Sequence, residues 1–523
     1  MDRDGRRPEY GMRVVLIATY ELGRPPFGLA SPAAWLAARG HAVACLDLSR
    51  QALDEDAIRA ADLIAFHLPM HTATRLAAEQ IERVRRLNPR AHICCYGLYA
   101  PMNQDFLKAL GVATILGGEF ETGIADLADR LARAAEREDT RATAAEPGAL
   151  SARGEQPEPA ISMARQEFLV PARLDLPALD RYARLQMPDG EEILAGYTEA
   201  SRGCKHLCRH CPIVPVYNGT FRVVGREIVL ADVRQQVTAG ARHVTFGDPD
   251  FFNGPAHGLA IVRALHREFP GVTYDVTIKI EHLLRHADLL PELRDTGCLF
   301  VTSAVESVDD AILERLDKGH TRAEFLAVAA NFREVGLILQ PTFVPFTPWT
   351  TLSGYRDLLR VIAECDFVPN VPPIQLAIRL LIPAGSRLLE LPEVQNLVEP
   401  FDRAGLAYPW RHADARVDAL GRRVQQIVER GEAAKLGRAQ IFAAIWKAAA
   451  EADGISSAGE SSIWQPPAGA HAAIPHFDEP WYCCAEPARE QFVSIGVAQP
   501  AAPAAAVATP AVRVATAAID GFV

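Results

Sequence analysis

The chain has 523 residues, enough for roughly two to four ordinary domains, and its hydrophobic content of 49% suffices for sizeable buried cores. A formal net charge of −11 argues against a large non-specific nucleic-acid surface, so we expect no nucleic-acid partner. No apolar run reaches the length of a membrane span, so we expect a cytoplasmic protein without a membrane partner.

The first part of the chain alternates short apolar runs with amphipathic stretches. Strands are expected at residues 13–20, 43–48, 63–68, 91–96 and 113–116. A helix with Ser31 as N-cap and Pro32 at its first position should follow the first strand. Helices are also expected at 72–87 and 121–135. This rhythm predicts an α/β domain over residues 1–135 with a doubly wound, Rossmann-like parallel sheet.

A flexible linker over residues 136–165 is expected next, because the segment is rich in Ala, Glu, Arg, Gly and Pro. A strand–helix rhythm then repeats six times, with strands at 196–201, 243–247, 272–280, 299–305, 337–344 and 374–380. Six such units predict a (βα)6 partial TIM barrel over residues 166–392, with active groups at the carboxyl ends of its strands. A helical region over 393–487 and a mostly disordered tail over 488–523 complete the expected organisation.

Three cysteines, Cys204, Cys208 and Cys211, lie in a short polar loop after the first barrel strand. Thiolates are soft ligands, and three of them would leave one iron of a four-iron, four-sulfur cluster without a protein ligand. The alternative is a structural zinc site completed by His206 or His210, since Cys3His is a common zinc ligand set. The loop alone leaves both metal centres open.

The spacing of the cysteines resembles the CxxxCxxC signature of the radical S-adenosylmethionine (SAM) enzymes. Gly247 and Asp248, after the second strand, resemble the family motif that receives the amino group of SAM. Glu306 and Ser307, ahead of a Lys-Gly-His-Thr run, resemble a pattern that faces the ribose or methionine part of SAM. His210 fills the position where the family places an aromatic residue near the adenine.

This resemblance implies a 4Fe-4S cluster held by Cys204, Cys208 and Cys211, and SAM bound with the help of Gly247, Asp248, Glu306, Ser307 and His210. Carboxylates suit a ribose diol or an ammonium group because they accept charge-assisted hydrogen bonds. Taken singly, a Gly-Asp-Pro turn or a capping serine needs no function. Because the motifs follow one another in family order over about 196–388, they favour the iron–sulfur cluster over zinc.

The first domain resembles the cobalamin-binding domain of the cobalamin-type radical SAM proteins. Residues 27–30, 36–41 and 117–121 carry the likeness. Where that family shows a pair of glycines approaching the corrin, this chain has Leu98 and Tyr99, and it lacks a DxHxxG motif. The sequence leaves two interpretations open: a cobalamin-binding domain, and a vestigial or substrate-facing one.

The run Cys483-Cys484-Ala485-Glu486-Pro487 resembles the motif that names the CUAEP/CCAEP-tail radical SAM proteins. Two adjacent thiols can clasp one soft atom between them. We therefore interpret Cys483 and Cys484 as catalytic residues that act on the substrate. The alternative is that the pair only packs in a buried core.

Together these patterns predict an enzyme that reductively cleaves SAM at a 4Fe-4S cluster to start radical chemistry on an unidentified small molecule, of transferase or oxidoreductase type. The electron donor expected for it is a flavodoxin or a ferredoxin. One alternative is a cobalamin-dependent radical SAM methyltransferase. An alternative from another class is a zinc-stabilised binding module.

Overall fold

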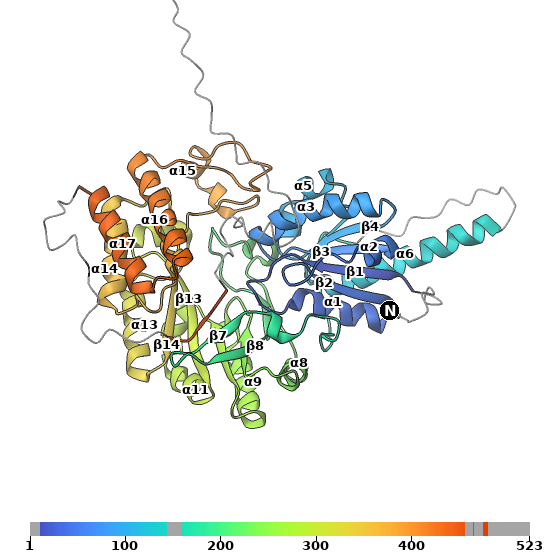
Figure 1. Ribbon diagram of the computed structural model, residues 1–523, viewed down its shortest axis with the longest axis horizontal. Helices are drawn as coiled ribbons and strands as arrows, with labels where there is room; N and C mark the ends of the chain where they lie inside the picture. The colour runs from blue at the N-terminus through green and yellow to red at the C-terminus, as the bar shows by residue number, and fades with distance from the viewer. Residues whose placement is uncertain (1–10, 144–157, 455–463, 465–473, 480–523) are drawn as a thin grey trace, which may run out of the picture.

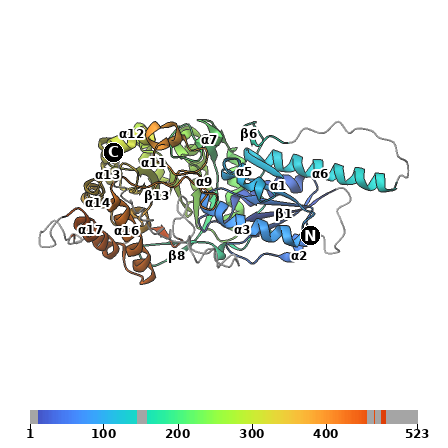
Figure 2. The ribbon, with the colours of Figure 1, turned by 90° about the horizontal axis from the view of Figure 1, so that it is seen from above.

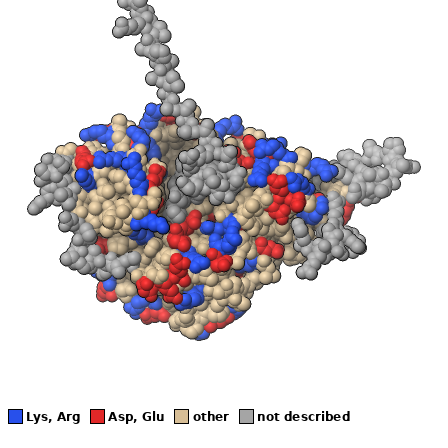
Figure 3. All heavy atoms as spheres, in the orientation of Figure 1, with Lys and Arg blue, Asp and Glu red and all other residues tan. Residues whose placement is uncertain are grey.

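The computed structural model describes residues 11–143, 158–454, 464 and 474–479. Figure 1 shows two bodies side by side, an N-terminal α/β domain coloured blue to cyan and a larger body coloured green to red. Within the described ranges, no helix is long and apolar enough to cross a membrane. On the face drawn in Figure 3, acidic and basic side chains lie interspersed.

The N-terminal domain is built on a parallel sheet with the strand order β2-β1-β3-β4-β5-β6. Its strands are β1 Arg13–Ala18, β2 Ala42–Asp47, β3 Leu63–His67, β4 His92–Tyr96, β5 Thr114–Gly118 and β6 Ile161–Ser162. Its helices are α1 Phe27–Ala38, α2 Glu55–Ala60, α3 His71–Leu87, α4 Tyr99–Met102, α5 Gln104–Ala109 and α6 Phe120–Thr143. Separate apolar clusters cover the two faces of the sheet, one involving α1 and α6 and the other α2 and α3. The predicted doubly wound sheet is confirmed.

Two details of this domain differ from expectation. Helix α1 begins at Phe27, so Ser31 lies inside it and donates its hydroxyl hydrogen to Glu121 Oε1 at 2.7 Å instead of capping the helix. Pro32 is also inside α1, and the Gly28 carbonyl that its missing N–H would meet accepts a hydrogen bond from Tyr96 Oη at 2.8 Å. The expected linker is structured at both ends, since α6 runs to Thr143 and β6 pairs with β5.

The larger body contains a curled half-barrel with the strand order β14-β13-β12-β11-β8-β7-β15. The parallel strands are β8 Glu192–Thr198, β11 His243–Phe246, β12 Thr273–Thr277, β13 Cys298–Glu306 and β14 Ile338–Phe343. At the β8 edge, β7 Arg184–Gln186 pairs antiparallel with β8, and β15 His476–Phe477 pairs antiparallel with β7. The predicted partial barrel is confirmed. The sixth strand is wrong in detail: Pro373–Leu376 is a 3-10 helix, and only a single bridge, Phe346 to Arg379, continues the sheet.

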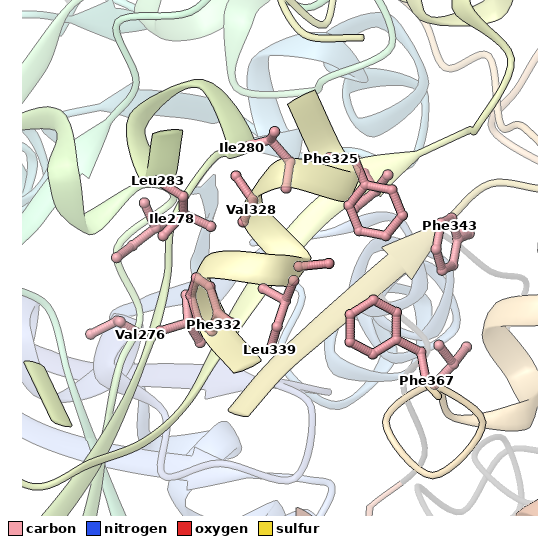
Figure 4. Packing of buried hydrophobic residues seen from close by; sticks show 14 of the residues in the cluster. Val276, Ile278, Ile280, Leu283, Phe325, Val328, Phe332, Leu339, Phe343 and Phe367 are labelled. Atoms are coloured by element: carbon pink, nitrogen blue, oxygen red, sulfur yellow. The ribbon is translucent and has the colours of Figure 1, made fainter. Parts of the chain in front are cut away.

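Helices cover the outer face of the half-barrel. They are α8 Arg226–Thr238, α9 Pro255–Glu268, α10 Ile280–Arg285, α11 Leu290–Asp295, α12 Asp310–Leu316, α13 Arg322–Val335 and α14 Leu352–Glu364. Figure 4 shows Phe325 and Phe332 of α13 beside Leu339 and Phe343 of β14. Because side chains alternate along a strand, the other face of β14 is left for the barrel interior.

The remaining elements complete the larger body. They are β9 Ser201–Gly203, β10 Phe221–Val223, α7 Val214–Tyr217, α15 Pro392–Gln395, α16 Ala415–Ala433 and α17 Arg438–Ala452. Helices α16 and α17 pack on each other and α17 packs on α14, which gives the C-terminal region its predicted helical character. Figure 2 shows the end of α6 projecting beyond the N-terminal domain, on the side away from the larger body.

Candidate functional site

The cysteine loop begins where β9 ends. Gly203, the last residue of β9, has a φ of 72°, and a Cβ on it would lie 2.4 Å from the Thr220 carbonyl oxygen. Only glycine adopts this conformation readily, so Gly203 directs the chain into Cys204. The loop is then anchored by hydrogen bonds from Lys205 N to Asn253 Oδ1 at 3.1 Å and from Arg209 N to Leu316 O at 2.9 Å.

The three thiols of the loop are close enough to influence one another. Burial raises the pKa of Cys204 to about 11 and that of Cys211 to about 12, and the neighbouring Cys208 thiolate adds to both shifts. Thiolates at these positions therefore need a bound cation to stabilise them. Three buried thiols that need a cation to ionise are what a metal-binding loop provides.

The spacing of the thiols distinguishes the two metal centres that the sequence leaves open. Among the described residues, only Cys204, His206 and Asp250 bring three potential ligand atoms within 4.8 Å of one another. At least one pair of the cysteine sulfurs is therefore further apart than this. A single zinc ion with Zn–S bonds of about 2.3 Å would hold its sulfurs about 3.8 Å apart. The wider arrangement fits an iron–sulfur cluster better than a closed zinc site.

Gly247 and Asp248 follow β11 directly. The carboxylate of Asp248 accepts hydrogen bonds from Ala200 N at 2.9 Å and from Ser201 Oγ at 2.5 Å. Burial raises the pKa of Asp248 to about 7, although these two donors act to lower it. A Cβ on Gly247 would lie 1.9 Å from Tyr197 Oη, so the glycine makes room for that ring. In this structure Asp248 braces the chain that leads into the cysteine loop.

Glu306 and His210 meet beside the cysteine loop. Glu306 Oε1 lies 3.0 Å from His210 Nε2 and 3.4 Å from Lys318 Nζ. Burial acts to raise the pKa of Glu306, but Lys318 and His210 outweigh it and lower that pKa to about 2. The hydroxyl of Ser307 accepts a hydrogen bond from Asp309 N at 3.1 Å, and Asp309, not Ser307, caps α12. Lys318 is not among the site residues predicted from the sequence, although its Lys-Gly-His-Thr run was the available signal.

Several buried imidazole nitrogens around the loop have no hydrogen-bond partner. They are His210 Nδ1 and both ring nitrogens of His320. Burial, with Lys318 and Lys279, lowers the pKa of His320 to about 4, so its ring is neutral near pH 7. Unpaired buried polar groups are costly, and a polar ligand at this place would satisfy them. These nitrogens therefore fit a small polar cofactor beside the cysteines.

A further polar group, which the sequence did not reveal, adjoins Cys204. Asp250 Oδ2 lies 2.7 Å from His282 Nδ1 and 3.5 Å from His206 Nε2, and Lys279 Nζ lies 2.9 Å from His206 Nδ1. Burial acts to raise the pKa of Asp250, but the two histidines outweigh it and lower that pKa. In the sequence Asp250 is part of an ordinary Gly-Asp-Pro-Asp turn, which gives no signal of this contact.

Arg202 joins the cysteine loop to the N-terminal domain. Its guanidinium donates to Glu121 Oε2 at 2.9 Å and to Glu199 Oε2 at 2.6 Å, and it lies 3.8 Å from Glu119 Oε2. Burial acts to lower the pKa of Arg202, but these carboxylates outweigh it and raise that pKa well above its usual value. Two of the three carboxylates come from the start of α6 and the turn before it. The two domains are thus joined by buried charges two residues from Cys204.

An interdomain cavity of about 210 Å³ lies between the sheet of the N-terminal domain and the cysteine loop. Its lining includes Glu21, His67 and Leu98 from the first domain, and Gly203 and Gly247 from the second. Glu21 Oε1 and His67 Nδ1 are 2.6 Å apart, so these two side chains contact each other in the lining of the cavity. The tail residues Cys483 and Cys484 lie outside the described residues.

The geometry agrees with the comparison with known families. Residues 198–348 match the model of the radical SAM superfamily, so the chain contains a radical SAM domain that runs from the end of β8 past β14.

Curated relatives are similar over part of the chain. The ribosomal protein uS12 methylthiotransferase RimO of Geobacter sulfurreducens is 26% identical over 33% of this chain and 40% of its own. The tRNA-2-methylthio-N(6)-dimethylallyladenosine synthase of Desulfosudis oleivorans is 26% identical over 50% of this chain and 56% of its own. The hopanoid C-3 methylase of Methylococcus capsulatus is 25% identical over 50% of this chain and 47% of its own. The chain thus spans about half the length of these relatives.

Solved structures share the fold across both domains. The cobalamin-dependent radical SAM enzyme OxsB, with aqua-cobalamin bound, has a TM-score of 0.62 at 14% identity and covers 81% of this chain and 67% of its own. The radical SAM methyltransferase TsrM from Kitasatospora setae, with cobalamin and a [4Fe-4S] cluster bound, has a TM-score of 0.52 at 17% identity over 68% and 70%. At these identities the likeness establishes the α/β domain followed by a half-barrel.

Proposed function

We propose that this protein reductively cleaves SAM at a 4Fe-4S cluster and directs the resulting radical chemistry to a small-molecule substrate. The observation that carries the proposal is the loop of Cys204, Cys208 and Cys211 at the carboxyl end of the half-barrel, which lies within the residues that match the radical SAM model. When bound, such a cluster supplies one electron to SAM, which breaks a carbon–sulfur bond of the sulfonium and gives a 5'-deoxyadenosyl radical and methionine.

The residues around the loop have separate parts in this proposal. Cys204, Cys208 and Cys211 hold three irons, and the positive charge of Lys318 stabilises the Cys208 and Cys211 thiolates. SAM offers amino, carboxylate and hydroxyl groups to the unpartnered nitrogens of His210 and His320. These contacts orient SAM next to the loop.

Three of the residues predicted to bind the cofactor act mainly by positioning in this proposal. Glu306 holds the imidazole of His210 through Nε2, which leaves Nδ1 for the ligand. Asp248 acts through the chain at Ala200 and Ser201, because those groups occupy its carboxylate. Ser307 fixes the turn into α12, and Gly247 contributes its backbone beside the interdomain cavity.

Metal analysis separates this function from that of a zinc-stabilised binding module. Protein purified and reconstituted without oxygen should carry about four irons and four sulfides per chain, and the Cys204→Ala/Cys208→Ala/Cys211→Ala protein should carry neither. Cys365→Ala, which removes a half-buried thiol at the C-cap of α14, is the matched control. A colourless wild-type protein with one zinc and no sulfide would establish the zinc module instead.

The tail pair Cys483 and Cys484 belongs to the proposed catalytic machinery. Strand β15 pairs with β7 at the edge of the half-barrel, and Glu479 shortly after it forms an ion pair with Arg50 at 3.2 Å. Cys483 and Cys484 follow within five residues of Glu479 in the sequence, and the run Cys-Cys-Ala-Glu-Pro that they begin supports the proposed role.

The tail role is tested on the pair itself. In Cys483→Ala/Cys484→Ala protein with the iron content of wild type, product from the substrate should fall to background. Cys365→Ala is again the control for the loss of a thiol. An unchanged product yield in the double variant would remove the pair from the mechanism.

A cobalamin-dependent methyltransferase is the second candidate, because OxsB and TsrM have this fold and bind cobalamin. The described cavity does not fit a corrinoid: about 210 Å³ is below the roughly 300–1,000 Å³ of sites for drug-sized ligands. The Glu21–His67 pair and Leu98 occupy the sheet edge that a corrin would approach. Corrin absorbance in protein reconstituted with cobalamin distinguishes this candidate, and we expect none above background.

The proposed chemistry also has consequences for the location of the protein and for its electron donor. A cluster of thiolates persists where thiols are kept reduced, so a cytoplasmic location is part of the proposal. Each cleavage consumes one electron, so a low-potential donor such as a flavodoxin or a ferredoxin is part of the proposal. Reduced flavodoxin should replace a chemical reductant in the SAM cleavage assay, and failure to do so would exclude that donor.

A further inference from the structure

A second, larger cavity of about 1080 Å³ opens on the side of the half-barrel, and we call it the barrel cavity. Thr302, Gln340 and Thr342 line it from β13 and β14, at inward-facing positions of those strands. Phe300, Trp464 and Phe477 add apolar surface. The volume suits a drug-sized ligand, and the lining combines an apolar wall with a few polar groups, as ligand sites do.

Arg24 connects this cavity with the one beside the cysteine loop. It comes from the turn between β1 and α1 of the N-terminal domain, and it lines both the barrel cavity and the interdomain cavity. Its guanidinium lies 5.7 Å from the ring centroid of Tyr197 and 4.7 Å from that of Phe477. Two aromatic rings from the second domain therefore stabilise this cation.

The guanidinium of Arg24 has an unused donor. Its Nη1 is buried without a hydrogen-bond partner, and within the described residues no carboxylate forms an ion pair with it. The nearby acids are engaged elsewhere, since Glu21 pairs with His67 at 2.6 Å and Glu479 pairs with Arg50 at 3.2 Å. A buried donor left unpaired costs free energy that an anionic ligand would recover.

We propose that Arg24 binds the carboxylate of the substrate, so that the barrel cavity selects small carboxylic acids with an apolar body. The planar fork of arginine matches a carboxylate with two parallel hydrogen bonds. A phosphate dianion would call for further cations, and Arg202, which also lines the interdomain cavity, is already paired with Glu121 and Glu199. That the bound carboxylic acid is a substrate rests on the proposed function. The inference gives the N-terminal domain a substrate-facing role.

The test uses matched ligands and full-length protein reconstituted without oxygen. Butyrate, hexanoate and 3-phenylpropionate are titrated beside their primary amides, with inorganic phosphate as a further arm. At least one carboxylate should bind about tenfold or more tightly than its amide, because a hydrogen bond to a charged group is worth that much. In Arg24→Gln the ratio should fall to about one, and Arg24→Lys, which keeps the charge without the fork, should retain part of it.

The matched control is Arg263→Gln, which removes the same charge from an exposed side chain paired with Glu292, and neither of these residues lines either cavity. It should keep the wild-type ratio, and iron content checks the fold of every variant. No preference for a carboxylate, a preference that survives in Arg24→Gln, or tighter binding of phosphate overturns the inference. If wild-type protein cleaves SAM but shows no preference for carboxylates, only the inference about Arg24 is wrong. If it prefers carboxylates but does not cleave SAM, only the proposed function is wrong.

Discussion

Glu306 is the residue on which the polar side of the candidate site depends. It ends β13 with a φ of 67° and is buried, with its carboxylate between His210 and Lys318. Its lowered pKa means that the carboxylate stabilises the fold fully above pH of about 4.5, and that this contribution is lost as pH falls toward 2. At neutral pH the Glu306 carboxylate and the Lys318 ammonium are therefore both charged.

The first prediction concerns this buried pair. Glu306→Gln alone leaves the buried ammonium of Lys318 without its partner, so it should destabilise the metal-free barrel by about 3–5 kcal/mol. Lys318→Met alone should act similarly, but Glu306→Gln/Lys318→Met should cost much less than the sum. Thermal unfolding of the four metal-free proteins at pH 7 measures this coupling.

An exposed pair provides the comparison. The same cycle on Arg234 and Glu268, which form a surface salt bridge between α8 and α9, should give a much smaller coupling, because water and salt screen exposed charges. Strictly additive effects at Glu306 and Lys318 would show that the two charges do not act as a unit.

The sequence identifies the residues of the site unevenly. Cys204, Glu306 and His210 stand in motifs of fixed spacing, and the structure brings Glu306 and His210 together. The role of Arg24 depends on two rings from the other domain, Tyr197 and Phe477. No local pattern encodes a contact between parts of the chain so far apart.

Strand β9 is the element that aims the cysteine loop. Three residues pair it with β10, and its last residue, Gly203, turns the chain with a positive φ. A side chain at that position would meet the Thr220 carbonyl oxygen and the ring of Tyr217. The geometry of the loop thus depends on Gly203, which has no side chain and acts only through its backbone conformation.

The second prediction tests this element. Gly203→Ala should lower the iron content of reconstituted protein several-fold, because the strain of about 1–2 kcal/mol at positive φ adds to the overlap with the backbone. Gly271→Ala is the control, since a Cβ there meets nothing within 4 Å. Iron analysis after identical reconstitution gives the result. Equal iron in both variants would show that Gly203 does not set the loop.

Local sequence patterns predicted most elements but missed two for identifiable reasons. The Ser-Pro pair at positions 31 and 32 is typical of a helix start, yet the Tyr96 hydroxyl takes over the carbonyl that Pro32 leaves free, and α1 begins earlier. The apolar run at 374–380 looks like a strand, but Pro372 and Pro373 lack the N–H groups for a ladder. In both cases a proline's effect depended on tertiary partners.

At the scale of the whole molecule, Arg202 links the two domains. Burial raises the pKa of Glu119 to about 7 and also raises that of Glu199, so these carboxylates depend on the guanidinium to stay ionised. Without it, the folded protein would bind more protons than the unfolded chain. Its stability would then fall as pH rises above the usual glutamate pKa.

The third prediction follows from this dependence. Arg202→Met should lower the melting temperature at both pH 6 and pH 8, and by several degrees more at pH 8, where the buried carboxylates lack both a partner and a proton. Arg226→Met removes an exposed arginine paired with Glu227 and should have little effect at either pH. A deficit in Arg202→Met that does not change with pH would mean that the carboxylates are not buried charges.

The central claim is that the cysteine loop serves to cleave SAM. Reconstituted wild-type protein, given SAM and dithionite without oxygen, should form 5'-deoxyadenosine and methionine, and Cys211→Ala protein should form neither. Chromatography with mass detection measures both products. Wild-type protein that carries a complete 4Fe-4S cluster yet yields no 5'-deoxyadenosine, or Cys211→Ala protein that yields as much as wild type, would contradict the account.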